Sequence, residues 1–218
     1  MSGTRPRNAG TKGRGRGRPP DLDSGELERK LLKAAERRFG EHGYAATSIR
    51  SIAEEAGANP ALVHYYFGTK RDLLLAVLDR AFEPLAGGVA ALSSDPDAGL
   101  EQVTALLFST LREHPALARL VVREVLLAGG EFRELFIERY APRLGGALPP
   151  VMARLRHEGR LRQDADPGIV ALLVLSLCIF PVIARPIAEP VLGTDHSPDG
   201  LDRLRRQVDA LLRRGVAA

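Results

Sequence analysis

Apolar residues recur every three or four positions along most of this chain, which is the spacing of a helix with one buried face. The clearest case follows Thr47, where four apolar side chains occupy positions i, i+3, i+4 and i+7. They are Ile49, Ile52, Ala53 and Ala56. Polar residues fall between them, and Thr47 or Ser48 can cap the start. The pattern therefore predicts a short helix with one buried stripe.

A tight turn and a second short helix follow. Gly57 stands where a left-handed residue ends a helix, and Asn59-Pro60 supplies an N-cap and a proline at the first helical position. The core-facing residues are predicted to be Leu62, Val63 and Phe67. The outward-facing residues are predicted to be Asn59, Ala61, His64 and Tyr65. A turn of about three residues between two helices is typical of a helix-turn-helix, whose second helix suits the major groove of DNA.

The rest of the chain also reads as helices, with no convincing strand. A first helix is expected from Asp23 or Ser24 to near Gly43, with Glu26 placed for a capping box with Asp23. After Lys70 a helix is expected over 72–82, which Pro84 then disrupts. Further helices are expected near residues 97–113, 115–128, 131–140, 149–158, 167–184 and 199–214. The fold class is therefore predicted to be all-α.

The last two predicted helices favour contact between copies of the chain. Residues 167–184 are apolar nearly all round, so they need cover on more than one side. Residues 199–214 carry one apolar stripe with arginines outside it. We expect a four-helix homodimer interface from these two segments, with a purely intramolecular core as the alternative. A two-fold dimer would make the bound DNA site approximately palindromic.

Composition bounds the class of protein. With 218 residues and 44% hydrophobic content, the chain can form a small head and a larger body. Its one cysteine, Cys178, lies in an apolar run, where it is expected to be a small buried hydrophobe, and it gives no disulfide framework and no metal set. No secretory signal is apparent, and the longest apolar run, 169–184, falls short of the roughly 20 residues that span a bilayer. We expect a cytoplasmic protein without a membrane segment.

Positive charge is concentrated at the amino end. Residues 1–20 hold six of the 31 basic residues and no acid, which leaves 25 basic against 27 acidic residues in the remainder. This Gly-, Pro- and Arg-rich segment is expected to be a disordered tail. Its run Arg14-Gly-Arg16-Gly-Arg18-Pro resembles an AT-hook core, which lies in a narrow A·T-rich minor groove. A solvated tail that adds only nonspecific attraction to DNA is the alternative.

The helix-turn-helix residues carry a further signal, because they resemble the TetR family of bacterial transcriptional regulators. The matching segments are Thr47-Ser48-Ile49-Arg50-x-Ile52-Ala53, Ala56-Gly57, His64-Tyr65-Tyr66-Phe67-Gly68-Thr69-Lys70 and Leu73-Leu74. The resemblance covers roughly residues 23–80, and residues 159–167 are similar to the family's approach to its dimer helices. It implies a three-helix DNA-binding head, a fourth connecting helix, an all-helical ligand-binding body and a homodimer. We accordingly divide the chain into a tail (1–20), a head (21–69) and a body (70–218).

The resemblance also implies roles for individual residues. Those expected to touch DNA, mostly at phosphates, are Thr47, Ser48, Arg50, Tyr65 and Lys70. Those expected nearest the base edges are Asn59, Pro60 and Ala61. His64 departs from the family, which often has tyrosine there, so its phosphate contact is less secure. Tyr66 and Phe67 are expected to pack rather than to touch DNA.

Ligand chemistry is harder to read. Candidate pocket residues in the helices between 97 and 158 are Phe108, Arg112, Arg123, Glu124, Phe132, Phe136 and Tyr140. Aromatic residues at helical spacing are more often core than ligand contacts. A small apolar or aromatic effector is preferred, because such pockets are mostly hydrophobic with a few orienting polar groups. No cofactor and no metal are expected.

Enzyme classes find little support. His157-Glu158-Gly159-Arg160 has a spacing found in DNA strand-transfer enzymes, but these need a nucleophilic hydroxyl and no tyrosine follows residue 140. No G-x-S-x-G, H-E-x-x-H or P-loop occurs. The sequence therefore predicts a nucleoid-associated transcriptional regulator, expected from the resemblance to be a repressor that a small molecule releases from double-stranded DNA. An architectural DNA-binding protein without an effector is the alternative.

Overall fold

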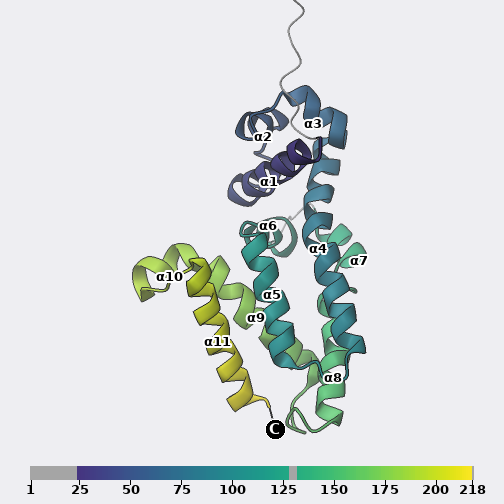
Figure 1. The fold of residues 1–218 in the computed structure, drawn as a ribbon, viewed down its shortest axis with the longest axis vertical. Coiled ribbons are helices and arrows are strands. Elements are labelled where there is room, and N and C mark those ends of the chain that lie inside the picture. Colours follow the sequence, from purple (N-terminus) through teal and green to yellow (C-terminus); the bar gives the residue numbers. More distant parts are fainter. Residues whose placement is uncertain (1–23, 128–131, 218) are drawn as a thin grey trace, which may run out of the picture.

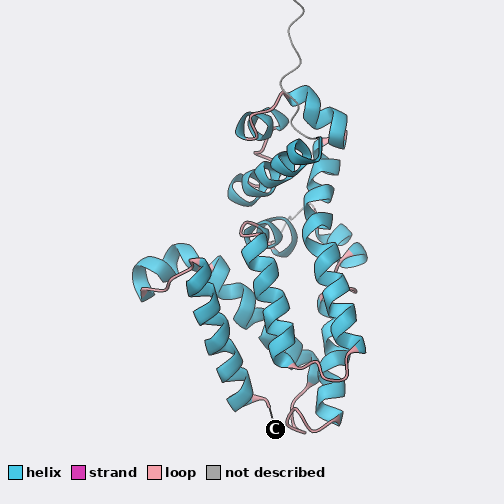
Figure 2. Cartoon of the chain, in the orientation of Figure 1, coloured by secondary structure: helices cyan, strands magenta, loops and turns pink. Residues whose placement is uncertain are grey.

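The computed structural model of this protein describes residues 24–127 and 132–217. Within these ranges the chain is built from helices and connecting turns, with no strand beyond one isolated bridge between Leu161 and Ala217 (Figures 1 and 2). A small helical head occupies one end of the elongated molecule, and a larger helical body occupies the other (Figure 1). The prediction of an all-α fold is confirmed.

Three helices form the head, namely α1 (Ser24–His42), α2 (Ile49–Glu55) and α3 (Pro60–Phe67). The local signals predicted their ends well. Gly43 and Gly57 have φ values of 84° and 66°, the left-handed conformation expected just after a helix. Ser48 caps α2, and the Oδ1 atom of Asn59 caps α3 by accepting a hydrogen bond from the N–H of Ala61 at 2.9 Å. The capping box expected at Asp23 lies outside the described residues.

The head has its own small core. Ile52, Ala53 and Val63, from the two short helices, are fully buried together with Leu31 and Phe39 of α1. Leu62 and Phe67, which were predicted to face the core, are half-buried. Because α2 and α3 are only seven and eight residues long, they depend on this packing rather than on their own helix propensity.

An ionic contact adds to the packing between α1 and α2. The carboxylate of Glu55, whose side chain is 10% exposed, pairs with Arg37 and Arg38 of α1. Burial of this carboxylate raises its pKa, but hydrogen bonds from both arginines outweigh that effect and hold the pKa of Glu55 below its ordinary value. The ionised form of Glu55 therefore fastens the second helix to the first.

This contact predicts a pH-dependent contribution to stability. Because folding lowers the pKa of Glu55, its contribution is present at neutral pH and is lost as the pH falls below the ordinary value of 4.5 and through the folded-state pKa. We expect Glu55→Gln to lower the melting temperature at neutral pH, and the difference from the parent to shrink in acid. Thermal unfolding followed by circular dichroism across that pH range measures this. A difference that stayed constant with pH would contradict the assignment.

A long helix, α4 (Lys70–Ser94), runs from the head into the body (Figure 1). The prediction that Pro84 would disrupt this helix is wrong. Proline lacks an N–H and normally kinks or breaks a helix, but here apolar side chains are buried on both sides of it, among them Phe82, Leu85 and Val89. Gly88 further allows close contact, since a Cβ atom there would lie 2.6 Å from the Leu106 side chain of the neighbouring helix. Packing therefore keeps the segment helical.

Beside α4, the body consists of the helices that follow it in the chain. They are α5 (Leu100–Glu113), α6 (Leu117–Val121), a π-helical turn (Val122–Leu126), α7 (Arg133–Arg139), a 3₁₀ turn (Gly145–Ala147), α8 (Leu148–His157), α9 (Pro167–Ile183), α10 (Arg185–Leu192) and α11 (Pro198–Gly215). The expected helix 115–128 is thus an α-helix that widens into a π-helical turn. Pro181 lies inside α9, and α10, which was not predicted, extends to one side of the body (Figure 1).

One face of the apolar helix α9 is buried in the body, through Val170, Ala171, Val174 and Cys178. Its Cys178 is fully buried, so the prediction of a small buried hydrophobe is confirmed. Burial, followed by the charge of Asp209, raises the pKa of that thiol to about 12. Among the described residues, no single helix is long and apolar enough to span a membrane. Only α9 and α10 taken together meet that criterion, and they are bent by 74°.

Candidate nucleic-acid interface and ligand cavity

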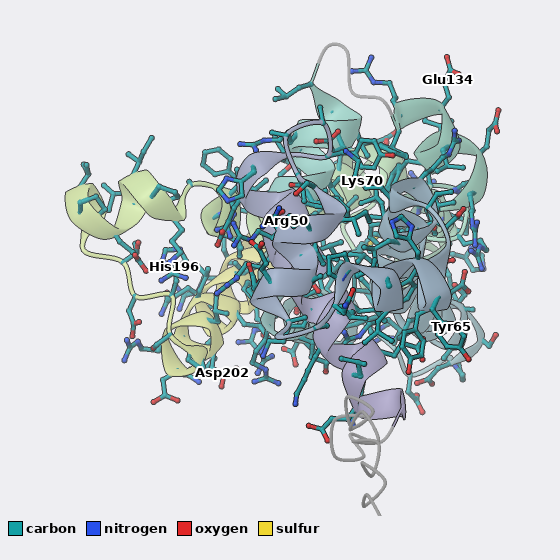
Figure 3. The ribbon with its side chains drawn as sticks, turned by 90° about the horizontal axis from the view of Figure 1, so that it is seen from above. Arg50, Tyr65, Lys70, Glu134, His196 and Asp202 are labelled. Atoms are coloured by element: carbon teal, nitrogen blue, oxygen red, sulfur yellow. The ribbon has the colours of Figure 1, made fainter. Side chains whose placement is uncertain are left out.

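The polar end of the head is formed by α3 and the start of α2, at the end of the molecule remote from the body (Figure 1). Tyr65 is 81% exposed there and stacks edge-on against Tyr66, with ring centroids 5.3 Å apart. Arg50 is also exposed and pairs with Glu54 at 2.8 Å. Figure 3 looks onto the molecule from this end and labels both residues.

The first turn of α3 presents small groups to solvent. Asn59 and Ala61 are exposed and Pro60 is partly buried, so the helix could come close to a groove without a bulky side chain in the way. Ser48 is exposed at the start of α2, where its hydroxyl accepts a hydrogen bond from the N–H of Ser51 at 3.0 Å. These four residues lie where the sequence analysis expected DNA contacts.

His64 is exposed on the same helix, but one of its ring nitrogens forms a hydrogen bond within the head. Its Nδ1 lies 2.8 Å from the carbonyl oxygen of Gly68, so Nδ1 carries the proton in the neutral ring. Nε2 is then an acceptor and cannot donate to a phosphate. His64 can therefore contribute a phosphate contact only as the doubly protonated cation, whereas the hydroxyl of a tyrosine would donate at any neutral pH.

Unlike Arg50 and Tyr65, the side chains of Thr47 and Lys70 form hydrogen bonds to backbone carbonyl groups of the head. Thr47 is 3% exposed, and its hydroxyl lies 2.7 Å from the carbonyl oxygen of Gly43. The ammonium of Lys70 donates to the carbonyl oxygens of Tyr44 and Thr47 at 2.9 and 3.0 Å, and it lies 4.3 Å from the centre of the Tyr44 ring. Both side chains thus hold the loop between α1 and α2 in place. Sequence reasoning missed this role because the partners are backbone atoms.

A second set of contacts joins the head to the body. The N–H of Tyr44 donates to the carboxylate of Glu124 at 2.9 Å, and Arg123 donates to the carbonyl oxygen of Glu41 at 2.9 Å. Phe132 packs edge-on against the ring of Tyr44 at 4.8 Å. Arg123, Glu124 and Phe132 were candidate pocket residues. The structure places them instead at this junction, because the π-helical turn and the residue before α7 lie against the end of α1 and the loop that follows it.

A buried hydrogen-bonded pair completes the junction. The Nδ1 of His114, between α5 and α6, lies 2.8 Å from a carboxylate oxygen of Glu36 on α1. Their side chains are only 8% and 9% exposed. Nearby, Gly40 allows close packing, since a Cβ atom there would lie 2.9 Å from the carbonyl oxygen of Ala116. No short motif marks this pair, since the two residues are 78 positions apart.

The body contains an apolar cavity of about 560 Å³ between α4, α5, α6 and α9. Phe136 lines it, as expected, alongside Phe82 and Phe180. Tyr140 does not line it. That side chain is 1% exposed, its hydroxyl donates to Asp79 at 2.5 Å, and burial followed by this hydrogen bond raises its pKa well above the ordinary value. Tyr140 is therefore a buried residue of the contact between α4 and the end of α7, and not a ligand contact.

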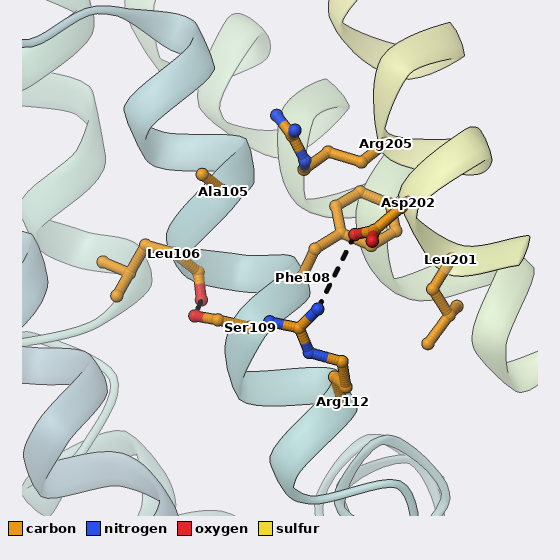
Figure 4. Close-up of a pocket in the computed structure, with 8 residues that line it drawn as sticks. All are labelled: Ala105, Leu106, Phe108, Ser109, Arg112, Leu201, Asp202 and Arg205. Carbon is orange, nitrogen blue, oxygen red and sulfur yellow. Dashed lines mark hydrogen bonds and ion pairs between the residues drawn. The ribbon is translucent and has the colours of Figure 1, made fainter. Parts of the chain in front are cut away.

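Phe108 and Arg112 line neither this cavity nor the contact between the head and the body. They line an open groove of about 470 Å³ between α5 and α11, where Arg112 is 3.7 Å from Asp202 (Figure 4). The seven candidate pocket residues therefore divide between four places, and only Phe136 reaches the large cavity. The cavity residues of α9, among them Leu175, Ser176 and Ile179, were missed because an apolar run does not reveal which of its faces meets a cavity.

Apolar side chains also remain exposed on the last three helices. On α9 these are Ile169 (59%) and Leu173 (46%), and on α11 Leu211 (58%). Three more lie on α10, which the sequence analysis did not predict: Ile187, Val191 and Leu192, each 69–73% exposed. Large exposed apolar groups on three consecutive helices mark these helices as a candidate interaction surface.

Comparison with known proteins gives consistent matches. A family model described as bacterial regulatory proteins, tetR family, matches residues 31–77, and one described as tetracyclin repressor-like, C-terminal domain, matches residues 96–218. The HTH-type transcriptional repressor NicS of Pseudomonas putida is 27% identical over 169 residues, covering 76% of this chain and 80% of its own. The HTH-type transcriptional repressor AcnR of Corynebacterium diphtheriae is 28% identical over 185 residues, covering 84% and 90%.

Solved structures share the fold. The ketosteroid transcriptional regulator KstR2 of Mycobacterium tuberculosis superposes with a TM-score of 0.72 at 20% identity, over 88% of this chain and 95% of that one. A transcriptional regulator from Saccharomonospora viridis in complex with choline gives 0.61 at 23% identity, over 89% and 99%. The second family model alone spans more than half of the chain.

Proposed function

Because the chain belongs to the TetR family of bacterial regulatory proteins, we propose that it is a transcriptional repressor whose α3 enters the major groove of its operator. The observation that carries this proposal is the exposed polar surface of α3, whose first turn offers only Asn59, Pro60 and Ala61 to a groove. Tyr65 and Arg50 flank that turn and are suited to phosphate contacts. The protein acts on DNA in the bacterial cytoplasm and carries out no chemistry on it.

The repressor binds as a homodimer through α9 and α11, with α10 extending the contact. The exposed apolar groups of these helices, Ile169, Leu173, Leu211 and the three of α10, support this arrangement, since burying them would remove apolar surface from water. A two-fold interface is self-complementary, so each subunit would present its head to one half of the operator. The operator is therefore an inverted repeat.

A small molecule in the apolar cavity releases the DNA. The π-helical turn supports this part of the proposal, because Val121 and Leu126 at its two ends line the cavity while Arg123 and Glu124 within it hold the head. A ligand that displaced this turn would act on the head directly. A coupling of about 1–3 kcal/mol between the two sites would change operator affinity roughly 5- to 150-fold.

Selection of bound DNA from a random pool tests the main proposal. We expect an inverted repeat to be enriched, and a compound that fills the cavity to release it. Uniform affinity for all sequences, with no compound able to release the DNA, would instead favour an architectural protein without an effector.

The basic tail is proposed to act as an arm in the minor groove, through Arg14, Arg16 and Arg18. If several of its charges neutralise phosphates, deletion of residues 1–18 should flatten the slope of log affinity against log salt concentration by about 0.9 per lost contact. Fluorescence anisotropy over a range of salt concentrations measures that slope. A deletion variant with the parental slope would show that the tail is not a DNA arm.

A further inference from the structure

Very few polar side chains line the cavity of the body. Of the described residues that line it, none carries a charged side chain, and the two polar side chains are Thr110 on α5 and Ser176 on α9. Three phenylalanines and a set of aliphatic residues make up the rest of its side-chain surface. Specificity in such a pocket must come from a very small number of polar groups.

The hydroxyl groups of both residues donate hydrogen bonds to the backbone of their own helices. Thr110 donates to the carbonyl oxygen of Leu106 at 3.0 Å, and Ser176 donates to that of Leu172 at 2.8 Å. In this arrangement each hydroxyl oxygen faces the ligand as an acceptor. A carboxylate inside this cavity would meet no cationic side chain among the described lining residues, and an ammonium group would meet no counter-charge there.

The outer part of the cavity is open. Leu126, Leu172 and Phe180 line it and remain 63–66% exposed, and Ser176 is exposed between the two α9 residues. Ser176 thus stands at the opening, while Thr110 lies deeper on α5 and is only partly exposed. A ligand hydroxyl at the opening could donate to Ser176 while its hydrocarbon part fills the interior.

From this geometry we infer that the cavity binds uncharged, predominantly hydrocarbon molecules with at most a hydroxyl as polar group, and that it rejects carboxylates and ammonium ions of the same skeleton. The inference rests on the proposed function, since it names the chemical class of effector for the same cavity. It excludes the charged effectors that the arginines near this region of the sequence would have suggested, because Arg112 and Arg123 lie outside the cavity.

Three probes of equal chain length test the inference on the full-length protein: decan-1-ol below its solubility limit, and decanoate and decyltrimethylammonium below their critical micelle concentrations. We expect decan-1-ol to raise the melting temperature by about 5–10 °C at a hundredfold excess over its Kd, and the two ions to have little effect. A larger shift with either ion than with the alcohol would overturn the inference.

Variants at the opening locate the binding site. Ser176→Arg places a guanidinium where the cavity meets solvent, so decanoate should acquire a melting-temperature shift that Ser176→Gln, the matched neutral control, does not show. Ala118→Phe, which fills the interior, should abolish the response to the alcohol; its circular dichroism spectrum checks that it folds. If Ser176→Arg gains no response to decanoate, the cavity is not the site and the inference fails.

The same experiments separate this inference from the proposed function. If a charged probe binds and releases operator DNA, the ligand class is wrong while ligand-controlled repression stands. If no probe shifts the melting temperature but the protein still selects an inverted repeat, the inference fails while DNA recognition stands. If an inverted repeat is not selected, repression fails whatever the probes do.

Discussion

Replacement of His114 by alanine is expected to destabilise the protein by about 3–5 kcal/mol, because it leaves the carboxylate of Glu36 buried without its partner. The two groups lie 2.8 Å apart with side chains that are 8% and 9% exposed, so water cannot readily take the place of the imidazole. For a chain of this size the loss corresponds to a fall in melting temperature of roughly 6–20 °C. Thermal unfolding followed by circular dichroism measures it.

The matched control removes both members of the pair. A double variant with Glu36→Met and His114→Leu exchanges the pair for apolar groups of comparable size, and such exchanges are often neutral or stabilising. We therefore expect the double variant to be more stable than His114→Ala alone. Equal stability of the parent and His114→Ala would mean that the carboxylate is not buried as described. Since the pair joins α1 to the α5–α6 corner, the same variants report how firmly the head is attached.

The substitution Ala61→Glu, which introduces a carboxylate, is expected to abolish tight operator binding and to leave the fold intact. Ala61 is exposed in the first turn of α3, where a negative charge is favourable to the helix dipole. Against DNA the same charge would face the phosphates, and a penalty of about 3 kcal/mol for like charges corresponds to a loss of roughly 100-fold in affinity. Fluorescence anisotropy with the selected operator measures the change in Kd.

Ala61→Gln is the neutral control for size and should alter base preference more than overall affinity. Tyr65→Ala should weaken binding to all sequences alike, since a residue that contacts phosphates carries no sequence information. Parental affinity of Ala61→Glu, with a parental melting temperature, would exclude α3 as the helix that meets DNA.

The chain folds along its length much as its local pattern predicts. Helix ends depend on residues within one turn of them, such as Ser48, Gly57 and Asn59, and these signals can be read from a few neighbouring positions. The outward face of α3 follows from the same periodicity, so the exposure of Asn59, Ala61 and Tyr65 was predictable without any knowledge of the body.

Residues with distant partners were not predictable in this way. The buried hydroxyl of Thr47 and the ammonium of Lys70 hold backbone carbonyl groups of the α1–α2 loop, and nothing in their own neighbourhood distinguishes this role from a DNA contact. Arg123 and Phe132 lie at helix spacing among candidate pocket residues, but they contact the head because the chain folds back on α1. Pro84 stays inside a helix because buried neighbours on both sides outweigh its missing hydrogen bond.

By itself the sequence determined the all-α class, the helix-turn-helix with its capped ends, and the basic amino-terminal segment, because each of these depends on the spacing and chemistry of neighbouring residues. The tertiary structure decided which apolar side chains line the cavity, which polar groups fasten the head to the body, and that α10 carries an exposed apolar face. The physical reason is that burial and pairing are properties of contacts between distant segments. Glu36 and His114 become a pair only when α1 lies against the α5–α6 corner.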